Sequence, residues 1–174
     1  MVYSKKETNT HTMHQKGFTL LEILLVIALI GIISLTVIVA VNPARQLEQT
    51  RNAERSQELV AIYQAVLQYG LESGEGLPSA IPVGDSQSDY REICRQGVAE
   101  ATCIADGLVF LQDDLVPAYL SEIPEDPTRA NVGTPNGTGY EIKVSTTNVV
   151  SLGSRSVEND EIISHNDDSY VAPN

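Results

Sequence analysis

A single carboxylate, Glu22, stands inside the most apolar stretch of the chain. Residues 18–41 contain only four clearly polar side chains, and Glu22 is the only charged one. At about 1.5 Å per residue, a helix of this length reaches about 36 Å, which is enough to cross a hydrocarbon core of about 30 Å. An acid inside such a span costs about 2.5–3.5 kcal/mol on insertion scales. Because none of the twenty residues after it is cationic, Glu22 needs a partner from elsewhere.

The segment before the apolar run offers that partner. Residues 1–17 are polar and carry three lysines and one acid. If the chain is cut before Phe18, the new α-amino group becomes a cation near Glu22, or near the Glu22 of a neighbouring copy. An ordinary secretory signal does not explain the run, which is too long and has a poor cleavage site at its exit. A plain single-pass anchor explains its length and the lysines, but it does not explain Glu22.

Residues 16–22 (KGFTLLE), followed by the apolar run, resemble the class III signal of type IV pilins and type II secretion pseudopilins. The resemblance combines a short basic leader, Gly17, Phe18, a glutamate at the fifth mature position and an uninterrupted helix. It implies that a prepilin peptidase cuts between Gly17 and Phe18 and that the Phe18 amine is N-methylated. It also implies that Glu22 pairs with the Phe18 amine of an adjacent subunit during assembly.

The elements behind this segment start with more helix. Asn42 and Pro43 interrupt the pattern, and helical sequence resumes to give an amphipathic continuation over residues 42–76. One apolar stripe at spacings of 3, 4 and 3 comprises Leu59, Ile62, Val66 and Tyr69. The charged side chains expected on other faces, where pairs can form along the helix, are Glu48, Arg51, Arg55 and Glu58.

Residues 77–174 form the predicted globular head, and they contain both cysteines of the chain. Cys94 and Cys103 are separated by eight residues within a loop-rich stretch, residues 77–106. A local disulfide is favoured in an exported domain, and in the loop-closure model it contributes about 2–3 kcal/mol. A metal or redox site calls for CxxC spacing or nearby histidines, and the sequence has neither. Two free thiols remain the alternative if the compartment is not oxidising.

The rest of the head predicts one short helix and a small sheet. Residues 107–115 have the spacing of a helix with Leu108, Leu111 and Leu115 on one side. Residues 140–144 alternate like a half-buried strand. Three further segments complete the pattern, as a turn at 146–148 and strands at 149–152 and 161–164. We therefore expect an α+β fold, in which an antiparallel sheet packs on the apolar stripe of the long helix.

Weaker candidate sites lie in the C-terminal part. Five acids could supply oxygen ligands for calcium, although a solvated acidic loop is favoured: Glu158, Asp160, Glu161, Asp167 and Asp168. Residues 136–138 (NGT) form a glycosylation sequon, but a glycine-rich turn is the preferred interpretation. His165 has no visible serine or acid arrangement around it, so nothing supports nucleophilic catalysis. The chain is not expected to be an enzyme or to need a cofactor.

The net charge and its distribution along the chain restrict the possible functions. The chain has 11 basic and 23 acidic residues, for a formal charge of −12. Because the leader carries three lysines and one acid, the part after residue 17 has a side-chain charge of −14. Such acidity argues against direct nucleic-acid binding. The positive-inside rule predicts a single pass with a cytoplasmic N-terminus and an exported head.

Two function classes follow. The first is a structural subunit that is held in the membrane, processed by prepilin peptidase, and then polymerised into a surface filament by an inner-membrane assembly platform. The second is an anchored extracytoplasmic domain that binds a ligand or a secretion partner and never polymerises. Glu22 discriminates between them, because a lone anchor has no reason to retain it. Within the filament class, the sequence does not separate pilus subunits from secretion pseudopilins.

Overall fold

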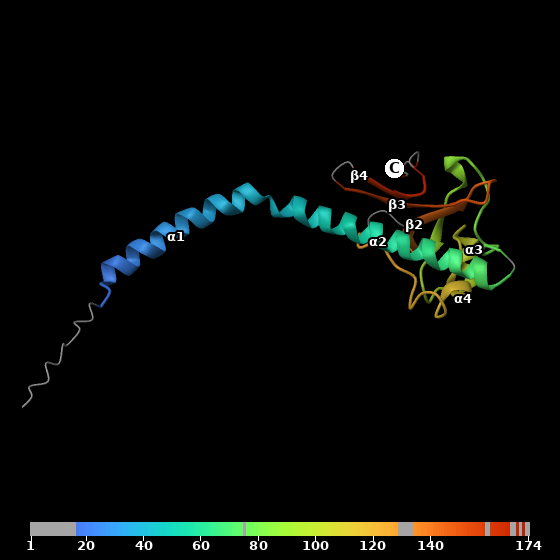
Figure 1. The fold of residues 1–174 in the computed structure, drawn as a ribbon, viewed down its shortest axis with the longest axis horizontal. Helices are drawn as coiled ribbons and strands as arrows, with labels where there is room; N and C mark the ends of the chain where they lie inside the picture. Colours follow the sequence, from blue (N-terminus) through green and yellow to red (C-terminus); the bar gives the residue numbers. More distant parts are fainter. Residues whose placement is uncertain are drawn as a thin grey trace, which may run out of the picture. The chain divides into compact units, whose positions relative to one another are not determined.

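The structure is a computed structural model that describes residues 17–74, 76–128, 134–158, 161–167, 170 and 172. The side chains of residues 37–41, 157, 161 and 162 lie outside this description. The chain divides into two compact units, Met1–Pro43 and Ala44–Asn174, and each is described by itself. Figure 1 labels α1 to α4 and β2 to β4.

The first unit holds one helix, α1 (Leu20–Val41). Its large apolar side chains have few contacts within the unit, and those of residues 18–35 are between 49% and 90% exposed. The Ser34 and Thr36 hydroxyls donate to backbone carbonyls one turn back, so both are satisfied inside the helix. Among the described residues, no helix is both long enough and apolar enough to cross a membrane. The single pass over residues 18–41 therefore stays a prediction.

The helical sequence is divided where Asn42 and Pro43 were expected to interrupt it. Asn42 has a left-handed backbone (φ 42°) and ends α1, and α2 (Pro43–Glu72) begins at the next residue. Proline suits the first position of a helix because its missing N–H has no intrahelical partner there. The helix ends four residues before the predicted limit of residue 76, and Gly74 follows with a positive φ of 70°.

The second unit is built on a four-stranded antiparallel sheet in the order β1-β2-β3-β4, with β1 (Arg91–Cys94), β2 (Gly137–Val144), β3 (Val150–Glu158) and β4 (Glu161–His165). The predicted turn is present: the N–H of Ser145 donates to the carbonyl of Val149, and Asn148 has a φ of 66°. The expected α+β fold and the last three strands are confirmed.

Helix α2 lies beside the sheet (Figure 1). Its apolar stripe packs on one face of the sheet, as predicted. The buried side chains of α2 and of the sheet form a single cluster that includes Leu59, Ile62, Val66, Tyr140, Ile142, Val144, Val150 and Leu152. Tyr69, at the end of the stripe, is only partly buried. Apolar burial of this kind is the main source of stability for the head.

The opposite face of the sheet is also covered, which corrects the expectation of a half-buried strand. Every residue of β2 is buried, including Glu141 and Lys143. Tyr170, near the C-terminus, lies over Gly153 so closely that a Cβ there would come within 2.2 Å of the ring. Its hydroxyl donates to Glu141 Oε2 at 3.1 Å. Alternation alone could not reveal that Tyr170 lies on the outer face of the sheet.

Residues 107–115 do not form the predicted short helix. Only α4 (Gln112–Leu115) is helical, whereas Val109 pairs with Ile93 of β1 as a parallel bridge. The N–H of Val109 donates to the Glu92 carbonyl at 2.9 Å, and the N–H of Cys94 donates to the Val109 carbonyl at 2.8 Å. These bonds to a distant segment override the local helical spacing. The three leucines at 108, 111 and 115 are nevertheless buried.

The segment expected to be mainly loop, residues 77–106, contains a 3₁₀ turn, η1 (Gln87–Asp89), then β1 and a short helix, α3 (Glu100–Ala105). A disulfide joins Cys94 of β1 to Cys103 of α3, with a Cα–Cα distance of 5.8 Å. The predicted pairing is confirmed. Both half-cystines are buried in a small cluster with Leu108.

Candidate functional site

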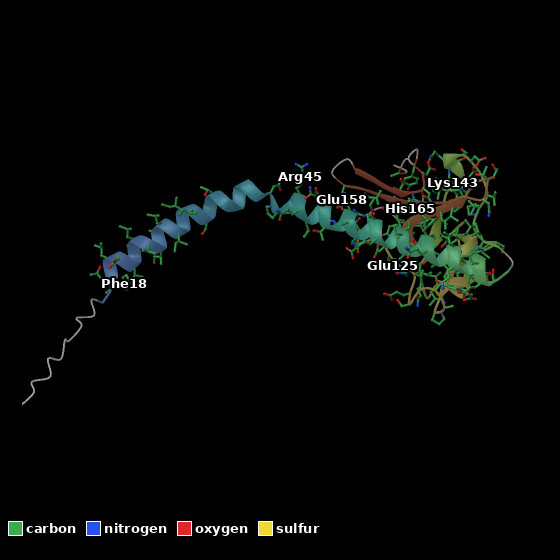
Figure 2. The ribbon with its side chains drawn as sticks, viewed as in Figure 1. Phe18, Arg45, Glu125, Lys143, Glu158 and His165 are labelled. Atoms are coloured by element: carbon green, nitrogen blue, oxygen red, sulfur yellow. A yellow bond between two sulfur atoms is a disulfide. The ribbon has the colours of Figure 1, made fainter. Side chains whose placement is uncertain are left out.

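The first candidate site is the segment that leads into α1. Gly17, Phe18 and Thr19 precede the helix without regular secondary structure, and the Phe18 side chain is 80% exposed (Figure 2). A Cβ added to Gly17 would meet no atom within 4 Å. The first turn then carries Glu22, the predicted assembly residue. Among the residues that the structure describes, none therefore covers this segment.

Thr19 fixes where α1 begins. Its backbone is extended (φ −79°, ψ 150°), and its side-chain oxygen accepts a hydrogen bond from the Glu22 N–H at 3.2 Å. Its carbonyl accepts from the N–H groups of Glu22 and Ile23 at 3.1 and 3.2 Å. This is the geometry of an N-cap, which satisfies amides that have no partner within the helix.

The Glu22 carboxylate makes no ion pair with any other residue that the structure describes. It is the one charged group among the described side chains of α1, and the large apolar side chains of this helix are exposed up to Leu35. The arrangement can present one acid and a large apolar surface to another molecule. The pairing of Glu22 with a Phe18 amine stays a prediction.

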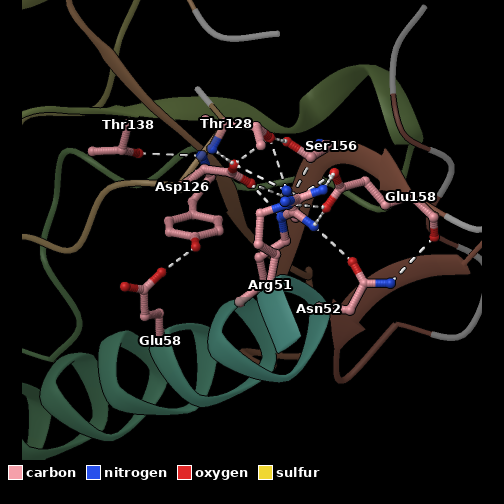
Figure 3. Close-up of polar contacts among 12 residues, drawn as sticks. Arg51, Asn52, Glu58, Asp126, Thr128, Thr138, Ser156 and Glu158 are labelled. Carbon is pink, nitrogen blue, oxygen red and sulfur yellow. Dashed lines mark hydrogen bonds and ion pairs between the residues drawn. The ribbon is translucent and has the colours of Figure 1, made fainter. Parts of the chain in front are cut away.

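A second polar cluster lies between α2 and the sheet, and it was not predicted (Figure 3). Arg55 is fully buried and uses all of its guanidinium nitrogens. Nε donates to Asp126 Oδ2 at 2.8 Å, Nη1 donates to Glu158 Oε2 at 2.6 Å, and Nη2 donates to Thr128 Oγ1 at 2.8 Å. Asn52 accepts a further bond from Nη1 at 2.6 Å. Arg55 therefore does not lie on an exposed face of the helix, as the sequence had suggested.

Arg51, one turn earlier, binds the same Glu158 carboxylate from a more exposed position. Its Nε donates to both carboxylate oxygens at 2.9 Å, and its side chain is 25% exposed. The cluster thus balances two arginines against Asp126 and Glu158. Each charged group is paired, so the cluster can fasten α2 to the sheet.

The pKa values of the two carboxyls follow from these contacts. Burial raises the pKa of Asp126, but hydrogen bonds from Arg55 and Thr128 outweigh it and hold that pKa below its usual range. The hydrogen bond from Arg51 lowers the pKa of Glu158, and Arg55 adds to the effect. Both carboxylates are therefore ionised at neutral pH.

Glu58, on the same helix, behaves in the opposite way. Burial raises its pKa, against a hydrogen bond that the Tyr140 hydroxyl donates to Glu58 Oε2. The surroundings of Glu58 therefore disfavour the charged form of its carboxyl group.

The calcium candidates are only partly described. Glu158 is bound to Arg51 and Arg55, as above. Asp167 accepts from the Tyr90 hydroxyl at 2.8 Å and lies 3.2 Å from Lys143 Nζ. Asp160, Asp168 and the side chain of Glu161 lie outside the described residues. Among the residues that are described, no group of three possible ligands comes together. Calcium binding stays a prediction that no contact supports.

His165 and the sequon residues 136–138 make contacts that serve the packing of the head. The ring of His165 lies 4.5 Å from the ring of Tyr63. Asn136 of the sequon donates to Asp106 Oδ2 at 2.7 Å, and the buried Thr138 hydroxyl donates to the Ile93 carbonyl. Residues 135 and 136 form a turn that enters β2, in agreement with the preferred interpretation.

Comparison with known proteins addresses the first candidate site and not the second. Residues 12–38 match a family model described as the prokaryotic N-terminal methylation motif. No curated protein and no solved structure matches the chain. The matched segment contains Gly17, Phe18, Thr19 and Glu22, and it ends inside α1. The head therefore has to be interpreted from its own contacts.

Proposed function

We propose that this chain, which carries the class III signal of type IV pilins and pseudopilins, is a structural subunit of a type IV pilus or pilus-like filament. The proposal rests on the exposure and the charge of α1. Its apolar side chains are exposed, and it bears one acid in its first turn, directly after the Gly17–Phe18 bond. A surface of this size needs a lipid or protein partner.

In the proposed sequence of events, the lysines of the leader stay in the cytoplasm while α1 lies in the membrane. Prepilin peptidase cleaves between Gly17 and Phe18, and the new amine is methylated. An inner-membrane platform then moves the subunit into the filament. There the apolar side chains of α1 exchange lipid for neighbouring helices, with close packing and pairing of polar groups as the driving forces.

The pair formed by Glu22 and the Phe18 amine of the adjacent subunit sets the axial position of each helix in this scheme. The pair contributes specificity more than stability, because a buried ion pair adds little net stability compared with apolar packing. An unpaired Glu22 in a wrong register, however, leaves a charge in an apolar environment, and this penalises every misaligned neighbour.

The experiment combines intact-mass analysis with recovery of sheared surface fibres. In wild type, we expect a chain that begins at Phe18 and carries one added methyl group, recovered in high-molecular-weight fibres. Glu22→Ala should be cleaved and inserted normally, but its fibre yield should fall at least about tenfold, because the Phe18 amine of the adjacent subunit would be left as a buried charge without its partner, at a cost of about 3–5 kcal/mol. Glu54→Ala, which removes an exposed acid of α2, is the matched control and should assemble normally.

Two results would contradict the proposal. A mature chain that begins at Met1, or after Ala40, excludes processing by prepilin peptidase. A correctly processed wild-type chain that is never found in fibres favours the anchored, non-polymerising domain instead. Fibres that remain at the cell envelope and depend on a secretion system would assign the subunit to the pseudopilins.

A further inference from the structure

The bond between Gly17 and Phe18 lies just outside α1, and the structure shows what keeps it there. Backbone bonds of the helix begin at the Thr19 carbonyl. Neither Gly17 nor Phe18 donates or accepts a backbone hydrogen bond with a described residue. The carbonyl carbon that a peptidase must attack is therefore not held in a helical turn.

We propose that Thr19 is a positioning residue for this cleavage: by capping α1, it keeps the Gly17–Phe18 bond in an extended, accessible segment. The proposal rests on the proposed function, which supplies the cleavage itself. It gives a physical role to Thr19, a residue that lies within the matched segment. Thr19 acts through the backbone of α1 and need not touch the peptidase.

Without a cap at Thr19, α1 could begin further upstream. A helix that began two residues earlier would draw the Gly17 carbonyl into a bond with the N–H of Leu21. That carbonyl would then lie against the next turn, and a peptidase would have to break the bond before binding the chain. The Thr19 side chain prevents this because its oxygen accepts a hydrogen bond from the Glu22 N–H. This N-cap geometry requires an extended backbone at Thr19 itself.

Gly17 contributes from the other side of the same boundary. Its φ is not positive, and a Cβ there would meet no atom within 4 Å, so nothing in the described chain demands glycine. Glycine is, however, a poor helix former, because ordering its backbone costs more entropy. Gly17 thus discourages the helix from spreading upstream while Thr19 gives it a fixed start. Any strict demand for glycine belongs to the pocket of the peptidase.

Three full-length precursors in proteoliposomes, incubated with purified prepilin peptidase, test the role of Thr19. Thr19→Val keeps the shape and β-branching but removes the acceptor oxygen, and Thr19→Ser keeps the oxygen. We expect kcat/KM for cleavage to fall about five- to tenfold in Thr19→Val and to stay near wild type in Thr19→Ser. Backbone chemical shifts of labelled Gly17 and Phe18 should have values typical of an extended backbone in wild type and in the serine variant. In the valine variant, they should move toward values typical of a helix.

Several outcomes would overturn the inference. Thr19→Val cleaved at the wild-type rate removes any positioning role. Slow cleavage of Thr19→Val with Gly17 and Phe18 still extended assigns the hydroxyl to a contact with the peptidase. Equal slowing of the valine and serine variants excludes the cap as the cause. If the wild-type precursor is not cut between Gly17 and Phe18 at all, the proposed function fails and this inference fails with it.

Discussion

Arg51 and Arg55 bind the same carboxylate from different environments, and this makes them a matched pair for measuring what burial does to an ion pair. Arg55 has no exposed side-chain surface, whereas the side chain of Arg51 is 25% exposed. Removing one partner of a buried pair leaves an uncompensated charge, which costs about 3–5 kcal/mol. Removing an exposed partner costs about 1 kcal/mol or less.

We therefore expect Arg55→Ala to lower the free energy of unfolding of the head by about 3–5 kcal/mol and Arg51→Ala to lower it by much less. Full-length protein in mild detergent can be unfolded with urea and followed by near-UV circular dichroism. That signal reports on the head, because six of the seven tyrosines lie at residue 63 or beyond. Equal small effects of the two substitutions would show that the buried cluster does not fasten α2 to the sheet.

Sequence reasoning placed Arg55 on an exposed face because charged helix residues are usually solvated. A signal for its burial was nevertheless present. Positions 52, 55, 59, 62 and 66 follow spacings of 3, 4, 3 and 4, so Asn52 and Arg55 continue the buried apolar stripe of α2 upstream. Polar residues on the buried face of a helix predict a buried hydrogen-bonding partner. The partner itself, Asp126, could not be found, since it lies 71 residues away in a connector.

At the scale of elements, the sequence predicted those whose signal is local. The stripe of α2, the alternation in β2 and the turn before β3 each depend on residues within one or two turns or strands. β1 has only four residues and depends on distant groups: the buried Glu92 accepts hydrogen bonds from the N–H groups of Thr134 and Gly139. The same holds for the bridge from Val109 to β1. Such elements are set by tertiary contacts, which spacing does not record.

The junction between α2 and the sheet should be acid-labile, and the sign follows from the pKa directions. Asp126 and Glu158 have lowered pKa values, so their contribution to stability is complete above the unfolded-state pKa, about 4, and is lost as the pH falls through their folded-state values. Glu58 and Glu141 have raised pKa values, mainly through burial, and they act in the opposite direction at higher pH. Stability should therefore rise slightly from neutral to about pH 5 and fall below about pH 4.

Urea unfolding across this pH range measures the effect. Asp126→Asn should be less stable than wild type at neutral pH, because Arg55 loses a charged partner, and its acid limb should be shallower. Glu58→Gln should reduce the slight rise between neutral pH and about pH 5 and leave the part that Glu141 contributes. An acid limb that is unchanged in Asp126→Asn would mean that other carboxyls govern the acid unfolding.

At the scale of the whole molecule, the opposed charges of the two ends matter most. The leader carries a net charge of +2, and the rest of the chain carries −14 in side-chain charge. A head so acidic stays soluble and resists nonspecific association. In the proposed filament, the same charge would oppose polymerisation, because many acidic heads would lie close together. The apolar surface of α1 must then favour assembly by more than this repulsion opposes it.

Assembly of the processed subunit should therefore depend on ionic strength. Raising salt from about 10 mM to about 150 mM shortens the Debye length from about 30 Å to about 8 Å, so repulsion between heads is largely screened. We expect the yield of fibres on removal of detergent, measured by sedimentation, to rise several-fold over this range. Sucrose, which adds no ions, should not substitute for salt. A yield that falls with salt would mean instead that opposite charges meet across subunit contacts and that attraction between them outweighs the net repulsion.

The identity of the cation separates screening from a specific site. At matched ionic strength, magnesium and calcium should raise the yield equally, because screening depends on charge and concentration alone. A rise with calcium that magnesium does not reproduce would assign the effect to the acids between residues 158 and 168, since calcium accepts more oxygen ligands in a more flexible geometry. Glu158 is already bound to two arginines, so that site would have to use the acids after it. Alanine substitution of Asp160 and Asp168 should then abolish the additional rise in fibre yield with calcium. The rise in fibre yield with a simple sodium salt should stay intact.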